Sequence, residues 1–303
     1  MRIVFMGTPE FAVPSLRILI AQHYDIVGVI TTPDKPAGRG NQVRTSAVKE
    51  FALTNNLPLL QPTNLKEETF LSSLRALKAD LQVVVAFRML PEVIWAMPPL
   101  GTFNLHASLL PKYRGAAPIN WAIIQGEKET GVTTFFLQQD IDTGNIIFQE
   151  KEAIQESDTV GALYERLKQK GAQLVLKTVK AIATGDYPNT PQEGEVTQAP
   201  KVFRETCKID WHQPRKVIYN LVRGLSPYPA AWTTLQGKNC KVYEVDIDFT
   251  HNQEQPTDTG SWISDDKTYL AFKAIDGWVA LKDLKLEGKK RLQIEDFLHG
   301  FKS

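Results

Sequence analysis

The chain is organised around the stretch Thr102-Phe103-Asn104-Leu105-His106-Ala107-Ser108-Leu109-Leu110-Pro111. Its first six residues alternate between polar and apolar side chains, a pattern that predicts a short strand. Side chains two positions apart in a strand point to the same side. We therefore expect Asn104 and His106 to project together near the carboxyl end of this strand, where Pro111 stops regular pairing.

An amide and an imidazole on one face of a strand are groups that acyl-transfer chemistry uses. The amide can donate to a developing oxyanion, and the imidazole can move a proton or stabilise charge. Asp142, in an Asp-Thr-Gly turn further along the chain, can supply the carboxylate that holds the imidazole. The alternative is a structural strand end with a satisfied histidine. The combination favours a catalytic set of Asn104, His106 and Asp142.

The composition limits the class of protein. With 303 residues, the chain is long enough for two domains, and 43% hydrophobic and 23% charged residues are typical of globular proteins. No apolar run approaches a membrane span, and we expect no signal peptide. Two cysteines, Cys207 and Cys240, match neither a disulfide framework nor a zinc spacing, which favours the reducing cytoplasm. The net charge of +1 means that only local basic patches could hold RNA.

The first part of the chain predicts a mostly parallel α/β sheet. A strand over residues 2–6, a helix and a second strand over residues 24–31 predict a right-handed crossover. The run Val83-Val84-Val85-Ala86 predicts a central strand that is buried on both faces. Only Gly7 occupies the first turn, so the three-glycine dinucleotide fingerprint is absent and NAD binding is disfavoured.

Residues 32–44 are rich in proline and glycine and carry Lys35, Arg39 and Arg44 against one acid. This composition predicts a mobile surface loop at the carboxyl end of a strand. The plain alternative is a solvated connection. A basic loop at the edge where open α/β sheets bind ligands is, however, well placed to bind phosphate.

Asp140 and Asp142 in one loop raise the question of a metal site. No histidine or further acid lies nearby in the sequence, so we expect no metal. The Asp-Thr-Gly turn of an aspartic protease is excluded as well, because that enzyme needs two such turns in an all-β frame.

Two runs, Asn104-Leu105-His106-Ala107-Ser108-Leu109-Leu110-Pro111 and Arg114-Gly115-Ala116-Ala117-Pro118-Ile119, resemble the signature of the folate-dependent formyltransferases. The resemblance covers essentially the whole chain and is strongest to members that act on charged initiator tRNA. It implies transfer of the formyl group of 10-formyltetrahydrofolate to the α-amino group of initiator methionyl-tRNA, for translation initiation in the cytoplasm. It assigns oxyanion stabilisation to Asn104 and His106, and orientation of His106 to Asp142. We expect a monomer with no metal and no membrane partner.

The same resemblance implies which residues bind the substrates. The backbone of the turn Phe87-Arg88-Met89-Leu90 would bind the pterin ring of the folate, although the family usually has a glycine where this chain has Arg88. The run Pro33 to Gly40 is similar to a family loop that enters the acceptor end of the tRNA, so Lys35, Arg39 and Arg44 are expected to bind tRNA. Further folate contacts are expected at Ser108, Leu109, Leu110, Pro111 and Asp140.

The domain organisation follows from a change in pattern. Residues 1–187 are expected to form a Rossmann-like formyltransferase domain, and residues 188–206, with several prolines and little periodicity, a linker. Residues 207–303 alternate in short stretches separated by turn residues, which predicts a small β-barrel. The resemblance implies an OB-like fold and tRNA binding there. The cations in residues 282–291 are either a solvated face or an RNA contact.

Two other functions stay open. A formyltransferase acting on an amino-sugar nucleotide can share both domains, but the basic segment 35–44 argues against it. Glycinamide ribonucleotide formyltransferases lack the second domain. A non-catalytic folate- or RNA-binding protein is also conceivable, and the intact set of Asn104, His106 and Asp142 argues against that.

Overall fold

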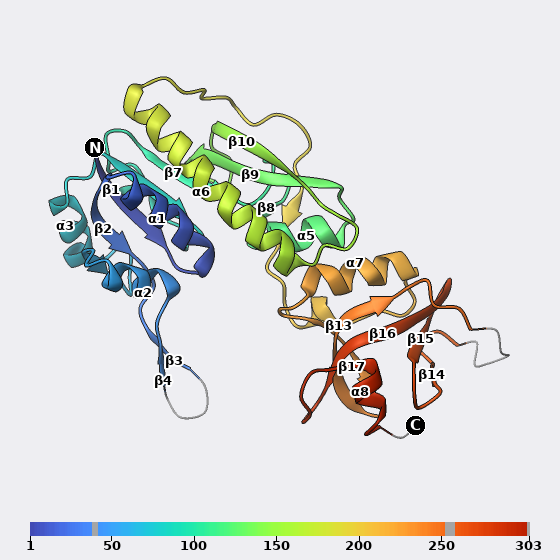
Figure 1. Cartoon of the computed structure of the whole chain (residues 1–303). Coiled ribbons are helices and arrows are strands. Elements are labelled where there is room, and N and C mark those ends of the chain that lie inside the picture. The colour runs from blue at the N-terminus through green and yellow to red at the C-terminus, as the bar shows by residue number, and fades with distance from the viewer. Residues whose placement is uncertain (38–41, 252–257, 302–303) are drawn as a thin grey trace. The chain divides into compact units, whose positions relative to one another are not determined.

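The computed structural model describes residues 1–37, 42–251 and 258–301 (Figure 1). It contains two compact units, whose segments alternate along the chain. The domain bounds 1–187, 188–206 and 207–303 therefore stay a prediction. The first unit consists of Met1–Gly115, Thr130–Glu152 and Tyr164–Gln198, and the second of Ala116–Glu129, Ala153–Leu163 and Ala199–Ser303.

The first unit is built on a seven-stranded sheet in the order β10-β9-β7-β6-β1-β2-β5. The pairs from β5 to β7 are parallel, and β7 pairs with β9 in the antiparallel direction. The predicted Rossmann-like, mostly parallel sheet is thus confirmed. The strands are β1 (Arg2–Gly7), β2 (Asp25–Ile30), β5 (Leu59–Leu60), β6 (Leu81–Val85), β7 (Thr102–His106), β9 (Glu129–Phe136) and β10 (Ile146–Ala153).

Helices pack on this sheet through apolar contacts and, in one place, through a buried hydrogen bond. The helix α3 contributes Leu74 to a core cluster with Val84 of the central strand. The long helix α6 packs against β9, where the hydroxyls of Thr134 and Thr178 hydrogen-bond at 2.8 Å. The helices of this unit are η1 (Glu10–Ala12), α1 (Val13–Ala21), α2 (Ala47–Thr54), α3 (Glu68–Ala76), α4 (Glu92–Trp95) and most of α6 (Val160–Thr184).

The strand order reverses between β1 and β6. From β1 the chain moves to β2 and β5 on one side, and it then returns to β6 and β7 on the other. Open α/β sheets bind ligands beyond the carboxyl ends of strands at such a switch point. The turn that begins at Ala86, directly after β6, lies there.

The basic segment 32–44 is more regular than the sequence predicts. The strands β3 (Lys35–Ala37) and β4 (Gln42–Arg44) pair in the antiparallel direction, with Lys35 opposite Arg44. The sequence predicts a surface loop here and gives no sign of this backbone pairing, which does not depend on a hydrophobic core. Arg39 lies outside the described residues.

The second unit contains an antiparallel sheet in the order β12-β13-β16-β15-β14, with β17 pairing to β16. Trp211 and Phe272 stack in its core with ring centroids 4.5 Å apart. The predicted small β domain of the OB-like type is confirmed. Its elements are α5 (Pro118–Ile124), η2 (Glu205–Cys207), α7 (Arg215–Leu225), β12 (Ala231–Leu235), β13 (Lys238–Asp246), β14 (Trp262–Ser264), β15 (Leu270–Ala274), β16 (Gly277–Leu286), β17 (Leu292–Gln293) and α8 (Ile294–Leu298).

Carboxylates of the second unit face two of the late cations. The guanidinium of Arg291 donates to both oxygens of Asp283 and lies 4.0 Å from the ring centroid of Tyr243. The hydrogen bond to Asp283 raises the pKa of Arg291. Lys282 lies 3.8 Å from Asp246. These contacts favour the structural interpretation of this cluster.

Among the described residues, no helix is sufficiently long and apolar to span a membrane.

We expect the thiols of Cys207 and Cys240 to be unreactive in the folded protein. They are 3% and 0% exposed, and burial raises the pKa of both, that of Cys240 to about 12. Reactive thiolate is therefore scarce at pH 8. Titration with Ellman's reagent should detect essentially no thiol natively and both thiols in guanidinium chloride. Fast reaction of either thiol before unfolding would contradict this prediction.

Candidate active site

The strand β7 presents Asn104 and His106 on one face, as the sequence predicts. Asn104 is paired in register with Val84 of β6 and with Phe135 of β9, so it lies inside the sheet. His106 is 6% exposed at the carboxyl end of the strand. Leu105, between them, points to the opposite face. The sheet therefore fixes the backbone from which both polar side chains project.

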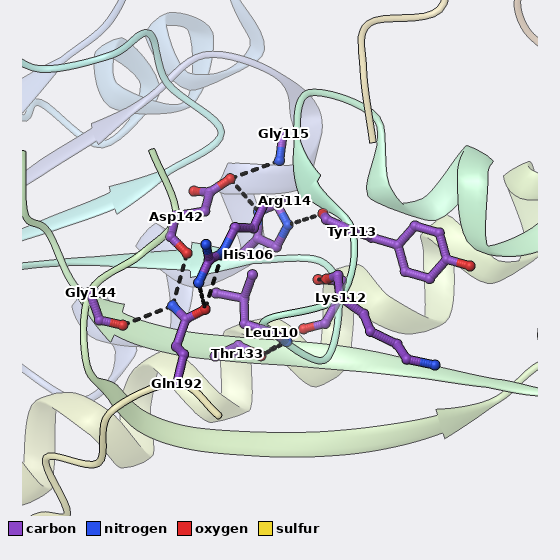
Figure 2. Close-up of polar contacts among 11 residues, drawn as sticks. His106, Leu110, Lys112, Tyr113, Arg114, Gly115, Thr133, Asp142, Gly144 and Gln192 are labelled. Atoms are coloured by element: carbon purple, nitrogen blue, oxygen red, sulfur yellow. Dashed lines mark hydrogen bonds and ion pairs between the residues drawn. The ribbon is translucent and has the colours of Figure 1, made fainter. Parts of the chain in front are cut away.

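The two ring nitrogens of His106 have different partners (Figure 2). Nε2 lies 2.8 Å from the carbonyl oxygen of Tyr113. Because a carbonyl only accepts, Nε2 carries a proton and donates it there. Nδ1 lies 3.7 Å from Oδ2 of Asp142, which is too long for a hydrogen bond and makes an ion pair only when both ring nitrogens carry a proton. The structure thus brings His106 and Asp142 together and leaves Nδ1 facing the carboxylate.

The position of Asp142 depends on an unusual backbone. Its φ angle is +54°, in the left-handed region that residues other than glycine rarely adopt. Its Oδ2 accepts a hydrogen bond of 2.9 Å from the N–H of Gly115. Two residues later, a Cβ on Gly144 would lie 1.6 Å from the carbonyl oxygen of Phe136. Glycine is therefore required for the turn to pass so close to β9.

The stretch after β7 is held by internal hydrogen bonds. Ser108 is fully buried and its hydroxyl donates to the carbonyl of Lys112 at 2.6 Å. The hydroxyl of Thr133 donates to the carbonyl of Ser108 and accepts from the N–H of Leu110. Gln149 donates to the carbonyl of Leu110 at 2.9 Å. These bonds fix the backbone, and the folate contacts expected at Ser108, Leu109, Leu110 and Pro111 stay predictions.

The side chain of Arg88, in the turn after β6, points to a neighbouring segment of the chain. Its guanidinium donates to the carbonyls of Pro62 and Thr63, the latter at 3.0 Å, and lies 5.5 Å from the ring centroid of Phe87. Burial lowers the pKa of Arg88. The side chain is thus held on the segment around residues 62–63, while Met89 is 73% exposed and Leu90 is buried.

The loop that carries Asp142 also exposes an apolar side chain. Ile141 is 60% exposed, and Asp140, beside it, accepts a hydrogen bond of 3.0 Å from Thr143 through its carbonyl. A single exposed apolar side chain is ordinary on a protein surface and by itself indicates no ligand site. Among the described residues, no group of three or more potential ligands could hold a metal ion.

Gln192 also contacts this site, and the sequence did not reveal it. Its Nε2 donates to the carbonyls of Asp142 and Gly144, each at 2.8 Å, and its Oε1 accepts from Nη2 of Arg114 at 2.7 Å (Figure 2). Gln192 is 50 residues from Asp142 along the chain, in the stretch predicted to be a linker. No local pattern could connect the two.

Comparison with known families matches both units. A formyl transferase family model matches residues 1–179, and a model of the formyl transferase C-terminal domain matches residues 201–302. The chain belongs to the formyl transferase family. Methionyl-tRNA formyltransferase of Bacteroides fragilis is 53% identical, with 99% of this chain and 95% of the relative covered. The Flavobacterium johnsoniae enzyme of that name is 54% identical, with coverage of 99% and 96%.

Solved structures share the formyl transferase fold at low identity. HypX from Aquifex aeolicus in complex with tetrahydrofolic acid has a TM-score of 0.67 at 18% identity over 100% of this chain. The chain spans 48% of that protein. WlaRD, a sugar 3N-formyl transferase, has a TM-score of 0.67 at 20% identity, with coverage of 96% and 99%. Identities this low establish the common fold and nothing finer.

We expect Gly144→Ala to destabilise the first unit by about 1–3 kcal/mol, the usual cost of overpacking. The added methyl would overlap the Phe136 carbonyl, so the loop or β9 must move. Urea unfolding followed by circular dichroism measures this cost. The matched control is Gly300→Ala, where the methyl meets nothing within 4 Å. Equal unfolding curves for the two variants would refute the close approach.

Proposed function

We propose that this protein transfers the formyl group of 10-formyltetrahydrofolate to the α-amino group of initiator methionyl-tRNA, giving N-formylmethionyl-tRNA for translation initiation. The observation that carries the proposal is the contact of His106 with Asp142, next to Asn104, in a chain 53% identical to the B. fragilis methionyl-tRNA formyltransferase. We place the enzyme in the cytoplasm as a monomer that needs no metal.

In the proposed reaction, the neutral amine of the methionyl group attacks the formyl carbon. A tetrahedral oxyanion forms, and it collapses when the folate nitrogen N10 leaves. Asn104 and His106 stabilise the oxyanion through hydrogen bonds. Nε2 of His106 is engaged by Tyr113, so Nδ1 is the ring nitrogen left to serve the reacting atoms. The proton lost by the amine therefore passes on the side of the ring that Asp142 faces, and it goes to the departing nitrogen.

The folate site in this proposal lies at the switch point of the sheet. The backbone of Phe87, Arg88, Met89 and Leu90 binds the pterin ring, and the residues 108–111 and Asp140 contact the rest of the molecule. The position of the Arg88 side chain is compatible with this arrangement. Its guanidinium donates to the carbonyls of residues 62 and 63, and only its backbone is assigned to the pterin ring. In this proposal, residues 1–187 form the catalytic domain and residues 207–303 form a tRNA-binding domain. Residues 188–206 connect the two, and Gln192 of this connection binds the Asp142 turn.

The tRNA acceptor end is proposed to bind the basic segment that contains Lys35, Arg39 and Arg44. This segment is anchored at its base by Asp34, which pairs with Lys49 and accepts a 2.9 Å hydrogen bond from Gln61. Both bonds lower the pKa of Asp34. An amino-sugar nucleotide is the second candidate acceptor, because WlaRD has this fold, but its 20% identity supports the fold alone.

The proposed function is tested by incubating the protein with 10-formyltetrahydrofolate and charged initiator tRNA. Base hydrolysis and mass spectrometry should then detect formylmethionine. A parallel reaction with a dTDP-linked amino sugar should yield no formylated product. Formylation of the sugar alone would transfer the assignment to the second candidate.

We expect His106→Ala and Asp142→Ala each to reduce turnover by at least about 100-fold, as for the loss of a preorganised catalytic group. Folate affinity should largely survive, since the pterin turn is a separate element. The loss of turnover in the double variant should be far smaller than the product of the two single losses, because the two side chains act as one unit. Steady-state kinetics with charged tRNA and fluorescence titration with folate measure both quantities. Near-normal turnover in either folded variant rules out its assigned role.

We expect Arg39→Ala to weaken the use of methionyl-tRNA by about 1–3 kcal/mol in kcat/KM, the range for one base-reading contact. Lys35→Ala and Arg44→Ala should weaken tRNA use more uniformly and flatten its salt dependence, as expected for phosphate contacts. Folate binding should not change in any of them. Kinetics at several salt concentrations test the assignment, and unchanged tRNA kinetics for Arg39→Ala would count against tRNA as the acceptor.

A further inference from the structure

The residues 190–197, here called the brace, bind the two loops that hold His106 and Asp142. All these segments belong to the first unit. The brace begins where Thr190 and Ile146 exchange both backbone hydrogen bonds, at 2.8 and 3.0 Å. It ends where the carbonyl of Thr197 accepts a 3.0 Å hydrogen bond from the N–H of Arg114. A stretch predicted to be a linker is therefore attached at both ends.

Gln192 connects the middle of the brace to the Asp142 turn. Both of its amide hydrogens are used, one by the carbonyl of Asp142 and one by the carbonyl of Gly144. Its amide oxygen accepts from Nη2 of Arg114 at 2.7 Å and from Nε at 3.3 Å. Two donors and an acceptor on one planar group are what a primary amide supplies. A side chain of similar length without the amide cannot make this set of bonds.

The brace reaches both strained residues that position His106. Asp142 and Tyr113 have φ angles of +54° and +60°, and residues other than glycine keep such angles only where their surroundings enforce them. Gln192 binds the carbonyl of Asp142, and the hydroxyl of Thr197 accepts from the N–H of Tyr113 at 2.9 Å. Tyr113 in turn binds Nε2 of His106, and Asp142 faces Nδ1.

We propose that Gln192 is a positioning residue that holds Asp142 against His106. Its amide donates to the carbonyls on either side of Thr143 and so keeps Asp142 in the left-handed conformation. Without them the turn relaxes, and the carboxylate moves away from Nδ1. The kinetic part of this inference rests on the proposed formyl transfer, whereas the restraint on the loop does not.

Two substitutions separate the roles of the amide. Gln192→Met keeps the length of the side chain and removes every hydrogen bond. Gln192→Glu keeps an acceptor for Arg114 but places a carboxylate oxygen against the carbonyls of Asp142 and Gly144. Both should lower kcat by about 10- to 100-fold, the effect of a small misplacement in an active site, with KM for both substrates nearly unchanged. The exposed Gln198 gives the control Gln198→Ala. Wild-type kcat in Gln192→Glu would overturn the proposal.

A double variant distinguishes positioning from a general structural role. If Gln192 acts through Asp142, Gln192→Met should change kcat by less than about threefold once Asp142 is already alanine. If Gln192→Met caused a general loss of structure, its effect on kcat would multiply with the effect of removing the carboxylate. Multiplicative effects in the double variant would therefore refute positioning through Asp142.

Amide hydrogen exchange tests the restraint without any substrate. Peptides that cover residues 138–145 should exchange faster in Gln192→Met than in the wild type or in Gln198→Ala, since local opening becomes easier. This result decides about the brace even if the protein fails to formylate charged tRNA, in which case only the proposed function falls. Unchanged exchange in these peptides would overturn the inference.

Discussion

The hydrogen bond between His106 Nε2 and the carbonyl of Tyr113 sets the direction in which the imidazole works. Because Nε2 donates to a fixed backbone oxygen, only Nδ1 is directed to the carboxylate of Asp142. The side chains of the pair are 7% and 12% exposed, so solvent screens their interaction weakly. The backbone of one loop and the side chain of another thus fix the position of the imidazole together.

The elements that sequence could predict are those in which local pattern and tertiary role agree. The alternation in β7 placed Asn104 and His106 on one face, and the apolar run of β6 placed the turn at Phe87 to Leu90 at the edge of the sheet. Strand β15 carries no such signal, since four of its five residues are buried and its side chains do not alternate. The pairing of β3 with β4 was not predicted either, because backbone hydrogen bonds leave no mark in side-chain hydrophobicity.

The candidate site was predictable where a residue acts through its own chemistry and not where it acts through another residue. His106 and Asp142 carry groups that acid–base chemistry needs, so their types alone drew attention. Gln192 carries an amide, which is common on surfaces, and its importance comes only from the carbonyls that it meets. The role of the cationic side chains in the second unit was ambiguous for a similar reason. The Lys and Arg cluster at residues 282–291 gave no sign that Arg291 is paired with Asp283.

The direction of β9 explains why Asp142 needs support from a distant segment. His106 pairs with Thr133, and Phe136, near the end of β9, lies beside Phe103 at the amino end of β7. The chain therefore leaves β9 about 10 Å from the level of His106, at roughly 3.3 Å for each strand residue. The loop that follows must run back along the sheet to deliver its carboxylate. The N–H of Gly115 holds the carboxylate of Asp142, but the left-handed backbone of Asp142 makes the turn itself less stable. A side chain that binds the turn from outside the sheet solves this problem, and Gln192 has the donors to do so.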